Sequence, residues 1–461
     1  MDNFHADDIS AVAKTLTQLD TPDFGANEGE TDPLARRVYL GLSGEPAASG
    51  DGLRLTFVDP DATAGRAGLK VDDILLMVDQ ETVSSMPELI TIAQSRRAGR
   101  DVRFSILRSG EPRSIETTLR PRTVETAKGL IVSYDSVEID GGRSRIITYR
   151  PDTQEPLPTV FYLQGFSCAS IDFGGEDDNP IRRFVEDLAR EAFVVVRQEK
   201  QGLGDSLSQT PCEQITFDEE VAAFSKGADW LKQQPFVDTD QIFFFGHSLG
   251  GVTAPALAEE HKPRGIITYG APSRRWFKYQ LDVFNEQPIV LGRSQRLARE
   301  NASIGIPFFR DVMTTQKPWS EIAAAHPKAI EKEILLTRGQ SILGRDFTFL
   351  RTLNSFDIEA AWRNYAGDVL ALHGSYDIHV ISDKDARNLV SLVNTKGRGR
   401  ASMRILEGAE HGFSRPEGSF KKYIQAARFG RWTASNALAT YDPRIAVETA
   451  NWIRTVLDDG R

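Results

Sequence analysis

The most informative segment of this chain is Phe243-Phe244-Phe245-Gly246-His247-Ser248-Leu249-Gly250-Gly251. The apolar run 241–245 predicts a short buried strand, and the residues after Ser248 fit a helix. Gly246 and Gly250 flank the serine at the spacing of a nucleophile elbow, a sharp turn that lifts a serine hydroxyl above the end of a sheet. Small residues are needed there because the strand and helix backbones approach closely. The same letters also fit a glycine-rich turn with an incidental serine.

The bulk properties describe a globular chain with more than one domain. At 461 residues, two or three domains are expected, and 40% hydrophobic with 26% charged residues suits a substantial core. The net charge of -10 argues against a nucleic-acid partner and against an anionic membrane surface. No apolar run approaches the roughly 18 residues of a spanning helix, so no membrane span is expected.

The N-terminus and the cysteines bear on location and on metal binding. The acidic start Met1-Asp2-Asn3-Phe4-His5-Ala6-Asp7-Asp8 lacks the apolar region of a signal peptide, which favours a cytoplasmic protein, or an exported one if the sequence is truncated. Residues 1–35 are interpreted as a helix at 9–19 followed by a polar linker. Two cysteines are too few for a disulfide scaffold or a cysteine zinc site, and no metal or cofactor is expected.

Residues 36–122 have the texture of short strands and carry a recognisable pattern. The pattern consists of the turn Ala62-Thr63-Ala64-Gly65, then Ala67-Gly68-Leu69, the acidic pair Asp72-Asp73 and the strand Ile74-Leu75. It resembles a PDZ domain of the bacterial type, with Asp72-Asp73 in place of the usual Gly-Asp. Strands are predicted at 38–42, 53–58, 102–108 and 114–119, and a helix at 86–98.

The PDZ resemblance implies a peptide-binding groove. Such domains add a peptide as an extra strand and hold its C-terminal carboxylate on backbone amides. Carried over, Tyr39, Leu40, Gly41 and Leu42 form the carboxylate loop and binding strand, and the groove is flanked by Leu89 and Ile92. The expected partner is a peptide or protein C-terminus. A purely structural role, docking the N-terminus onto the rest of the chain, is the alternative.

From residue 124 to 461, strand patterns alternate with helix patterns. After an antiparallel hairpin at Asp140-Gly141-Gly142, the pattern predicts a parallel, doubly wound α/β sheet. The predicted strands cover residues 132–139, 144–149, 159–163, 193–196, 241–245, 265–269, 369–372 and 403–406. With the elbow, this order resembles the α/β-hydrolase family. The aromatic-rich segment 272–367 interrupts the alternation and stands where that family has a helical cap, although a helical insertion packed elsewhere is the alternative.

The serine needs a base, and the base needs an acid that orients it. In this fold the chain order is serine, acid, histidine. Of seven histidines, only His411 follows the acid and lies on the loop after the last strand. Asp377, in His373-Gly374-Ser375-Tyr376-Asp377, follows a strand and is the expected acid, with Asp383 and Asp385 as fallbacks. Ser248, Asp377 and His411 are therefore the predicted catalytic triad.

Two amides are expected to form an oxyanion hole. One belongs to Leu249, the residue after the nucleophile, and the other to Phe166, in the loop after strand 159–163. Gln164 stands where the family often has histidine, so the role of its side chain stays open. Glu199 and Lys200 either line the pocket or form a solvated ion pair. In the resembled fold Cys168 and Cys212 follow neighbouring strands, and we hypothesise a disulfide or a close thiol pair between them.

The interpretation is a serine hydrolase that cleaves an ester, thioester or amide of a small acyl substrate. A peptidase of the prolyl-oligopeptidase-like type is the main alternative, because a PDZ domain could deliver a peptide. Acyl transfer or thioester release from a carrier is another alternative. A binding protein that retains the fold without catalysis is the non-enzymatic one.

Overall fold

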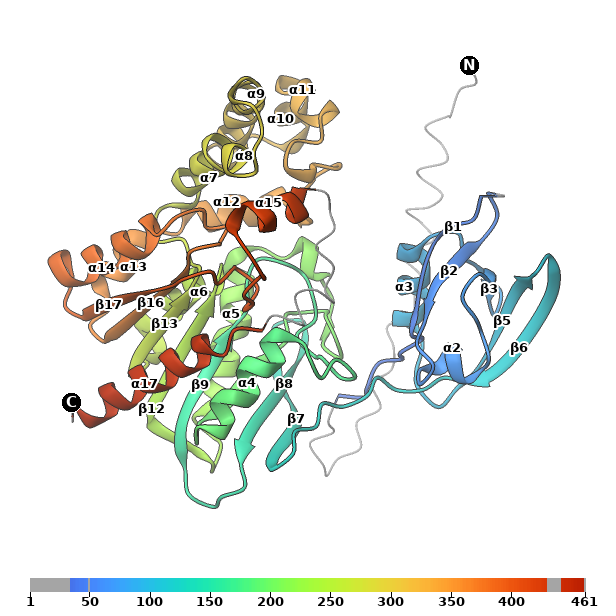
Figure 1. Ribbon diagram of the computed structural model, residues 1–461, viewed down its shortest axis with the longest axis horizontal. Coiled ribbons are helices and arrows are strands. Elements are labelled where there is room, and N and C mark those ends of the chain that lie inside the picture. The colour runs from blue at the N-terminus through green and yellow to red at the C-terminus, as the bar shows by residue number, and fades with distance from the viewer. Residues whose placement is uncertain (1–33, 49, 429–440, 460–461) are drawn as a thin grey trace. The chain divides into compact units, whose positions relative to one another are not determined.

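The structure, a computed structural model, describes residues 34–48, 50–428 and 441–459 (Figure 1). The helix expected at 9–19 lies outside the described residues. The described residues contain one sheet of six strands, one of nine and a small one of two. Within these ranges no helix is long and apolar enough to cross a membrane.

The smaller sheet is antiparallel and runs in the order β1-β2-β3-β5-β6, with β4 paired to β3. Leu53, Leu55, Leu75 and Phe104 fill its core, which explains the alternating pattern seen in the sequence. Its elements are β1 (Leu42–Pro46), β2 (Leu53–Val58), α2 (Thr63–Arg66), β3 (Ile74–Val78), β4 (Glu81–Thr82), α3 (Met86–Ser95), β5 (Asp101–Arg108) and β6 (Glu111–Thr118).

The first strand of this sheet begins later than the sequence pattern predicts. The prediction of a strand at 38–42 is wrong, because β1 begins only at Leu42. Gly41 adopts a φ of 71°, which breaks the extended run. The carbonyls of Tyr39 and Leu40 accept hydrogen bonds from the α2 amides of Thr63 and Ala64 instead of joining a ladder.

The larger sheet runs in the order β7-β8-β10-β9-β12-β13-β16-β17, with β11 paired to one end of β8. The six neighbouring strands β10, β9, β12, β13, β16 and β17 are parallel. The β7–β8 hairpin and the β8–β10 pair are antiparallel, and an antiparallel hairpin was predicted there. This is the doubly wound sheet of an α/β hydrolase. The strands are β7 (Leu130–Ile139), β8 (Gly142–Pro151), β9 (Leu157–Leu163), β10 (Val194–Gln198), β11 (Leu207–Ser208), β12 (Val237–His247), β13 (Gly265–Tyr269), β16 (Asp368–Gly374) and β17 (Arg400–Leu406).

Helices cover both faces of this sheet (Figure 1). On one face, α4 and α17 contribute to a core with Tyr162, Phe245 and Leu370. On the other face, α5, α6 and α14 pack on Phe161 and Phe244. The bounds are α4 (Pro180–Arg190), η2 (Cys212–Gln214), α5 (Phe217–Leu231), α6 (Gly250–His261), α14 (Lys384–Lys396), α15 (Phe420–Arg428) and α17 (Arg444–Asp458).

The segment between β13 and β16 is helical, and we refer to it as the cap. Its aromatic residues, including Trp276, Phe309 and Phe349, join the same core as α5 and α6, so the cap packs on the sheet domain. The cap elements are α7 (Trp276–Asn285), α8 (Gln287–Val290), α9 (Gln295–Thr314), α10 (Trp319–Ala325), α11 (Pro327–Glu331), η3 (Ile334–Leu336), β14 (Ser341–Ile342), β15 (Arg345–Asp346), α12 (Phe347–Ser355) and α13 (Ile358–Asn364).

Candidate active site

Ser248 lies in a strained turn between β12 and α6. Its φ of 53° falls in the left-handed region, which non-glycine residues rarely adopt. A Cβ atom on Gly246 would lie 2.4 Å from the Gly250 carbonyl oxygen, and one on Gly250 would lie 2.0 Å from the Leu163 carbonyl oxygen. Both glycines are therefore required by close backbone approach, and the turn has the geometry of a nucleophile elbow.

His411 and Asp377 are in direct contact. The Nδ1 atom of His411 lies 2.7 Å from Asp377 Oδ2, while Asp377 Oδ1 accepts hydrogen bonds from the amides of His379 and Val380. Burial by itself lowers the pKa of His411, but the adjacent Asp377 carboxylate outweighs it and raises that pKa above the usual value. A histidine held in this way keeps its Nε2 atom free to accept a proton.

The fallback acids are engaged elsewhere. Asp383 pairs with Arg387 at 2.6 Å on α14. Asp385 accepts from the Ser273 amide at 2.8 Å and pairs with Arg274 at 2.7 Å. The geometry therefore favours Asp377 as the acid.

His247, next to the serine, holds the loop that carries His411. Its Nε2 atom lies 2.9 Å from the His411 carbonyl oxygen and must donate to it, so Nδ1 accepts from the Tyr162 hydroxyl at 3.3 Å. Burial lowers the pKa of His247 to about 3, which keeps the ring neutral. The chain-order argument discarded His247 as a base and gave no signal for this supporting role.

Ser248 and His411 both line one cavity of about 550 Å³. Its walls include the loop after β9 and residues from two parts of the cap, and the role of this segment as an active-site cap stays a prediction. The described cap residues that line it are Trp276, Tyr279, Gln280, Val283, Gln287, Leu335 and Leu343.

Three buried polar atoms in the walls of this cavity have no partner among the described residues. They are the Oε1 atoms of Gln164 and Gln280 and the indole Nε1 of Trp276. No aspartate or glutamate is among the described residues that line the cavity. The described lining is therefore largely apolar and carries no carboxylate, and the three unpartnered atoms lie buried within the walls.

The two predicted oxyanion donors lie at this cavity. Within the described ranges, the amides of Phe166 and Leu249 donate to no acceptor. A Cβ atom on Gly165 would lie 3.1 Å from Ser248 Cβ, so the Gly165–Phe166 peptide passes directly over the serine. The Gln164 side chain donates to the carbonyls of Ser167 and Ala169 at 3.4 and 3.2 Å, which identifies it as a brace for this loop.

Glu199 and Lys200 do not line the cavity and are not solvated, so both expectations for them were wrong. Glu199 is buried and its Oε1 accepts from the hydroxyl of Ser170 and the amides of Ile171 and Asp172. Burial raises the pKa of Glu199 to about 7. Local sequence cannot show such burial, because it arises from loops distant in the chain.

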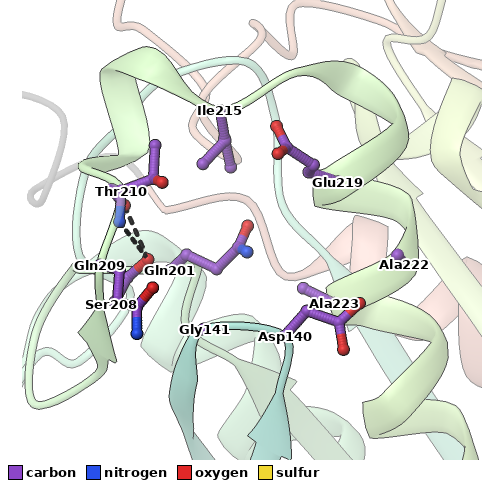
Figure 2. A pocket seen from close by; sticks show the side chains of 10 residues that line it. All are labelled: Asp140, Gly141, Gln201, Ser208, Gln209, Thr210, Ile215, Glu219, Ala222 and Ala223. Atoms are coloured by element: carbon purple, nitrogen blue, oxygen red, sulfur yellow. Dashed lines mark hydrogen bonds between the residues drawn. The ribbon is translucent and has the colours of Figure 1, made fainter.

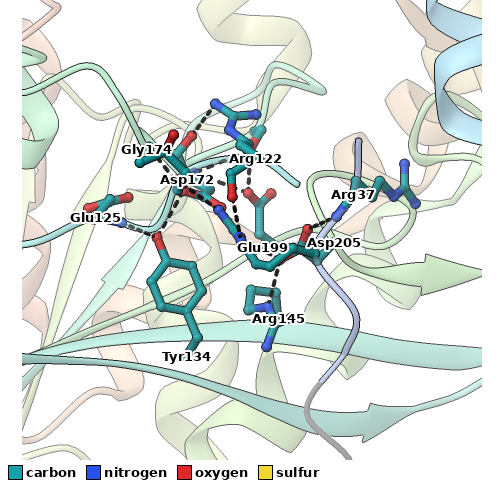
Figure 3. Close-up of polar contacts among 12 residues, drawn as sticks. Arg37, Arg122, Glu125, Tyr134, Arg145, Asp172, Gly174, Glu199 and Asp205 are labelled. Carbon is teal, nitrogen blue, oxygen red and sulfur yellow. Dashed lines mark hydrogen bonds and ion pairs between the residues drawn. The ribbon is translucent and has the colours of Figure 1, made fainter. Parts of the chain in front are cut away.

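Figure 3 shows a network of polar contacts that includes Asp172, Glu199 and Asp205. Asp172, between the cavity-lining residues Ile171 and Phe173, accepts hydrogen bonds from Arg36 and from the Tyr134 hydroxyl. Burial works against ionisation of Asp172, but Arg36 outweighs it and lowers the pKa of the carboxyl. Arg36, which precedes the small sheet in the chain, is thus bonded to the loop that walls the cavity.

Cys168 and Cys212 form a disulfide with Cα atoms 5.9 Å apart. It joins the loop after β9 to η2. A second cavity of about 250 Å³ lies beside this segment and is lined by Gln201, Thr210, Ile215 and Glu219, among others (Figure 2). None of the three predicted triad residues reaches it. Within the described residues, no group of histidine, cysteine and acidic side chains could hold a metal ion.

The structure places some of the predicted peptide-groove residues at the edge of the small sheet and others in its core. β1, which begins at Leu42, is an edge strand of the small sheet, and Tyr39 and Gly41 lie in the loop before it. Leu89 and Ile92 are 2% and 5% exposed and pack in the domain core, so their part in peptide binding stays a prediction.

Comparison with protein families gives two matches. Residues 38–119 match the PDZ domain family, and residues 140–383, more than half of the chain, match the family described as X-Pro dipeptidyl-peptidase (S15 family).

Curated relatives match only a short part of the chain. A probable periplasmic serine endoprotease DegP-like of Halomonas elongata is 31% identical over 104 residues, which is 20% of this chain and 22% of that protein. The magnetosome formation protease MamE of Paramagnetospirillum magneticum is 35% identical over 95 residues, which is 21% of this chain and 13% of that protein. The chain thus spans about a fifth or less of the length of these relatives.

Similar solved structures include two esterases. Est1E from Butyrivibrio proteoclasticus has a TM-score of 0.39 at 15% identity, over 65% of this chain and 97% of that one. The thermostable carboxylesterase EstE1 from a metagenomic library has a TM-score of 0.42 at 17% identity, over 71% and 89%.

Proposed function

The chain belongs to the X-Pro dipeptidyl-peptidase (S15) family, and from that premise we propose that it is a serine hydrolase acting through Ser248, His411 and Asp377. The observation that carries the proposal is the 2.7 Å contact between His411 and Asp377 at the cavity on which Ser248 opens. A strained serine, a buried histidine and an orienting carboxylate are the parts that acyl transfer needs.

In the proposed reaction, His411 Nε2 takes the Ser248 proton as the hydroxyl oxygen attacks the acyl carbonyl. Asp377 holds the imidazole in the tautomer with hydrogen on Nδ1 and stabilises the imidazolium that forms. The Phe166 and Leu249 amides receive the tetrahedral oxyanion, and His411 returns its proton to the leaving group. Water, activated by the same histidine, then hydrolyses the acyl-enzyme.

The preferred substrate is an ester with an uncharged acyl group. Release of a dipeptide from a free N-terminus requires recognition of an α-ammonium, and a buried ammonium needs a carboxylate partner. The absence of acidic side chains among the described cavity residues supports an ester instead.

A peptidase is the second candidate, and the family match is the observation that favours it. Rates on p-nitrophenyl acyl esters, on a free Gly-Pro p-nitroanilide and on its N-blocked form separate the two. The ester proposal expects hydrolysis of the esters and little or none of the free dipeptide. Preference for the free dipeptide over its blocked form would establish the peptidase. Acyl transfer is measured in the same assay as the ester product formed with added alcohols.

For the small domain, we propose capture of a peptide C-terminus at the edge strand β1. The family match and the open edge support this role, because a peptide strand can pair there. Fluorescence polarisation with a C-terminal peptide library tests it, with C-terminally amidated copies as controls. Binding that is indifferent to amidation, or no binding, would favour a structural role.

We also propose an oxidising compartment for this protein, in place of the cytoplasm expected from its N-terminus. The disulfide supports that location, since such bonds persist outside the cytoplasm. The relative described as periplasmic is similar to this chain over 20% of this chain's length, and that similarity also favours a location outside the cytoplasm. Thiol labelling of the protein in fractionated cells tests this location. Free Cys168 and Cys212 in a cytoplasmic fraction would contradict it.

A further inference from the structure

The loop that carries the proposed oxyanion donor is bonded from behind by two buried cations. Lys200 Nζ donates to the Gly165 carbonyl at 2.6 Å and approaches the Phe166 carbonyl at 3.5 Å. Arg345, in β15 of the cap, donates to the Phe166 carbonyl at 3.1 Å. Both side chains are buried completely. Neither contacts the cavity that Ser248 lines.

One carboxylate compensates the two cations. Glu220, in α5, lies 3.1 Å from Lys200 and 2.8 Å from Arg345. The three charges sum to +1 at neutral pH, in a place that water does not reach. A residual positive charge behind the loop would stabilise negative charge that develops in front of it.

Covalent geometry links the Lys200 contact to the donor. The chain has no cis peptide bond in its described residues, so the carbonyl of Gly165 and the amide N–H of Phe166 point in opposite directions across one planar unit. A carbonyl held on Lys200 therefore directs the N–H away from Lys200, toward the Ser248 side of the loop. Hydrogen bonding to the carbonyl also polarises the peptide and strengthens its N–H as a donor.

We propose that Lys200 is the positioning residue of the oxyanion hole. We also propose that Arg345, which belongs to the cap, makes the position of the Gly165–Phe166 loop depend on the position of the cap. The inference rests on the proposed function, because it assigns the Phe166 amide to the oxyanion. The Phe166 ring adds to the coupling with the cap, since it stacks on Trp276 at 6.1 Å and meets the edge of Phe349 at 5.4 Å. The Arg345 guanidinium lies 3.6 Å from the centre of the Phe349 ring. A displaced cap would release the donor loop.

The charge state of Lys200 falls within an accessible pH range. Burial lowers the pKa of its ammonium to about 8, while Glu220 acts in the opposite direction and Arg345 in the same one. The neighbouring Glu199 carboxyl, whose pKa is about 7, faces residues 170–172 rather than Lys200. Loss of the Lys200 proton removes positive charge from behind the oxyanion, so kcat is expected to fall as pH rises above about 8.

The test compares Lys200→Met and Lys200→Arg with a control, Lys226→Met, at an exposed lysine of α5. With p-nitrophenyl butyrate, Lys200→Met should lower kcat on the order of 100-fold and leave KM within about threefold, as expected for loss of an interaction made in the transition state. Affinity for trifluoroacetophenone, whose adduct with serine carries an oxyanion, should fall in parallel. Lys200→Arg should restore part of kcat and move the alkaline limb to higher pH. The control should match wild type.

Two further measurements cover misfolding and failure of the proposed function. If Lys200→Met does not fold, Arg345→Lys and Lys200→Gln replace it, with smaller losses of kcat expected. Hydrogen exchange reports the loop without any activity, and the Phe166 amide should exchange faster in Lys200→Met than in Lys226→Met. If the wild-type protein neither hydrolyses esters nor binds the ketone, the proposed function is refuted, and the hydrogen-exchange comparison still tests the role of Lys200. A folded Lys200→Met with kcat within about twofold of wild type, or with unchanged exchange at Phe166, refutes the role of Lys200.

Discussion

Gly270 lies directly against Asp377, so that a Cβ atom on the glycine would come within 2.6 Å of the carboxylate oxygen Oδ2. That oxygen is the acceptor for His411 Nδ1, which would itself lie 2.9 Å from the same Cβ. The end of β13 therefore leaves room for the acid–base pair only because residue 270 has no side chain. Its φ of 56° adds a second requirement for glycine.

Gly270→Ala is expected to displace the acid from the base and to lower kcat by more than about 100-fold. Gly339→Ala is a matched control, because Gly339 has a φ of 55° and a Cβ there meets nothing within 4 Å. Both variants carry the same backbone strain, about 1 kcal/mol, so equal losses of thermal stability are compatible with the account. Equal activities of the two variants would contradict it.

The pH dependence follows from the pKa of His411. Protonated His411 cannot accept the serine proton, so kcat/KM should rise with pH through that raised pKa. Asp377→Asn removes the carboxylate that raises the pKa and leaves burial, which lowers it. The acid limb should therefore shift to lower pH, while kcat falls on the order of 10⁴-fold.

Asp383→Asn is the control for that substitution, because Asp383 was the alternative acid and is paired with Arg387. It should leave both the acid limb and kcat near their wild-type values. An acid limb that moves in Asp383→Asn but not in Asp377→Asn would reverse the assignment of the acid.

Selectivity for the acyl group should depend on Gln280. If the unpartnered Oε1 atom of its side chain turns toward a polar acyl substituent, Gln280→Leu should lower kcat/KM for a hydroxylated acyl ester on the order of 10-fold or more relative to its deoxy analogue. Gln287 also lines the cavity, but its side chain already donates to the Ile378 carbonyl at 2.9 Å. Gln287→Leu should leave the selectivity ratio unchanged, and a ratio that is the same in all three proteins would exclude this role for Gln280.

The disulfide should stabilise the fold by restricting the unfolded chain. Cys168 and Cys212 are 44 residues apart, which corresponds to about 4 kcal/mol of unfolding free energy from loop closure. Urea unfolding of the Cys168→Ser, Cys212→Ser double variant should show a lower midpoint, and reduced wild type should behave like it. Identical midpoints with and without the bond would show that it adds no stability.

The parallel sheet was predictable from sequence because buried strands are continuous apolar runs. The strand predicted at 265–269 has these bounds in the structure, and β12 was found but extends back to Val237 across an irregular register. The small sheet was harder, because its first strand depends on where the Tyr39 and Leu40 carbonyls find donors. Those donors belong to α2, some 24 residues further along the chain.

Chain order and strand ends were enough to single out Asp377 and His411, which the structure places in contact, and their catalytic roles stay predictions. Supporting residues were not predictable, since their roles arise from contacts between distant segments. Lys200 reaches the Gly165 carbonyl over a separation of 35 residues, and His247 reaches the His411 carbonyl over 164. The sequence around Lys200 and around His247 contains no pattern that indicates either contact.

Labelling by a fluorophosphonate probe tests the central claim, that Ser248 is an activated nucleophile. Peptide mapping of the labelled wild-type protein should place the probe on Ser248. Labelling should be absent in Ser248→Ala and slowed by a factor on the order of 10³ or more in His411→Ala, where the base is lost. An unlabelled wild type, or Ser248→Ala labelled as strongly as wild type, would contradict the account.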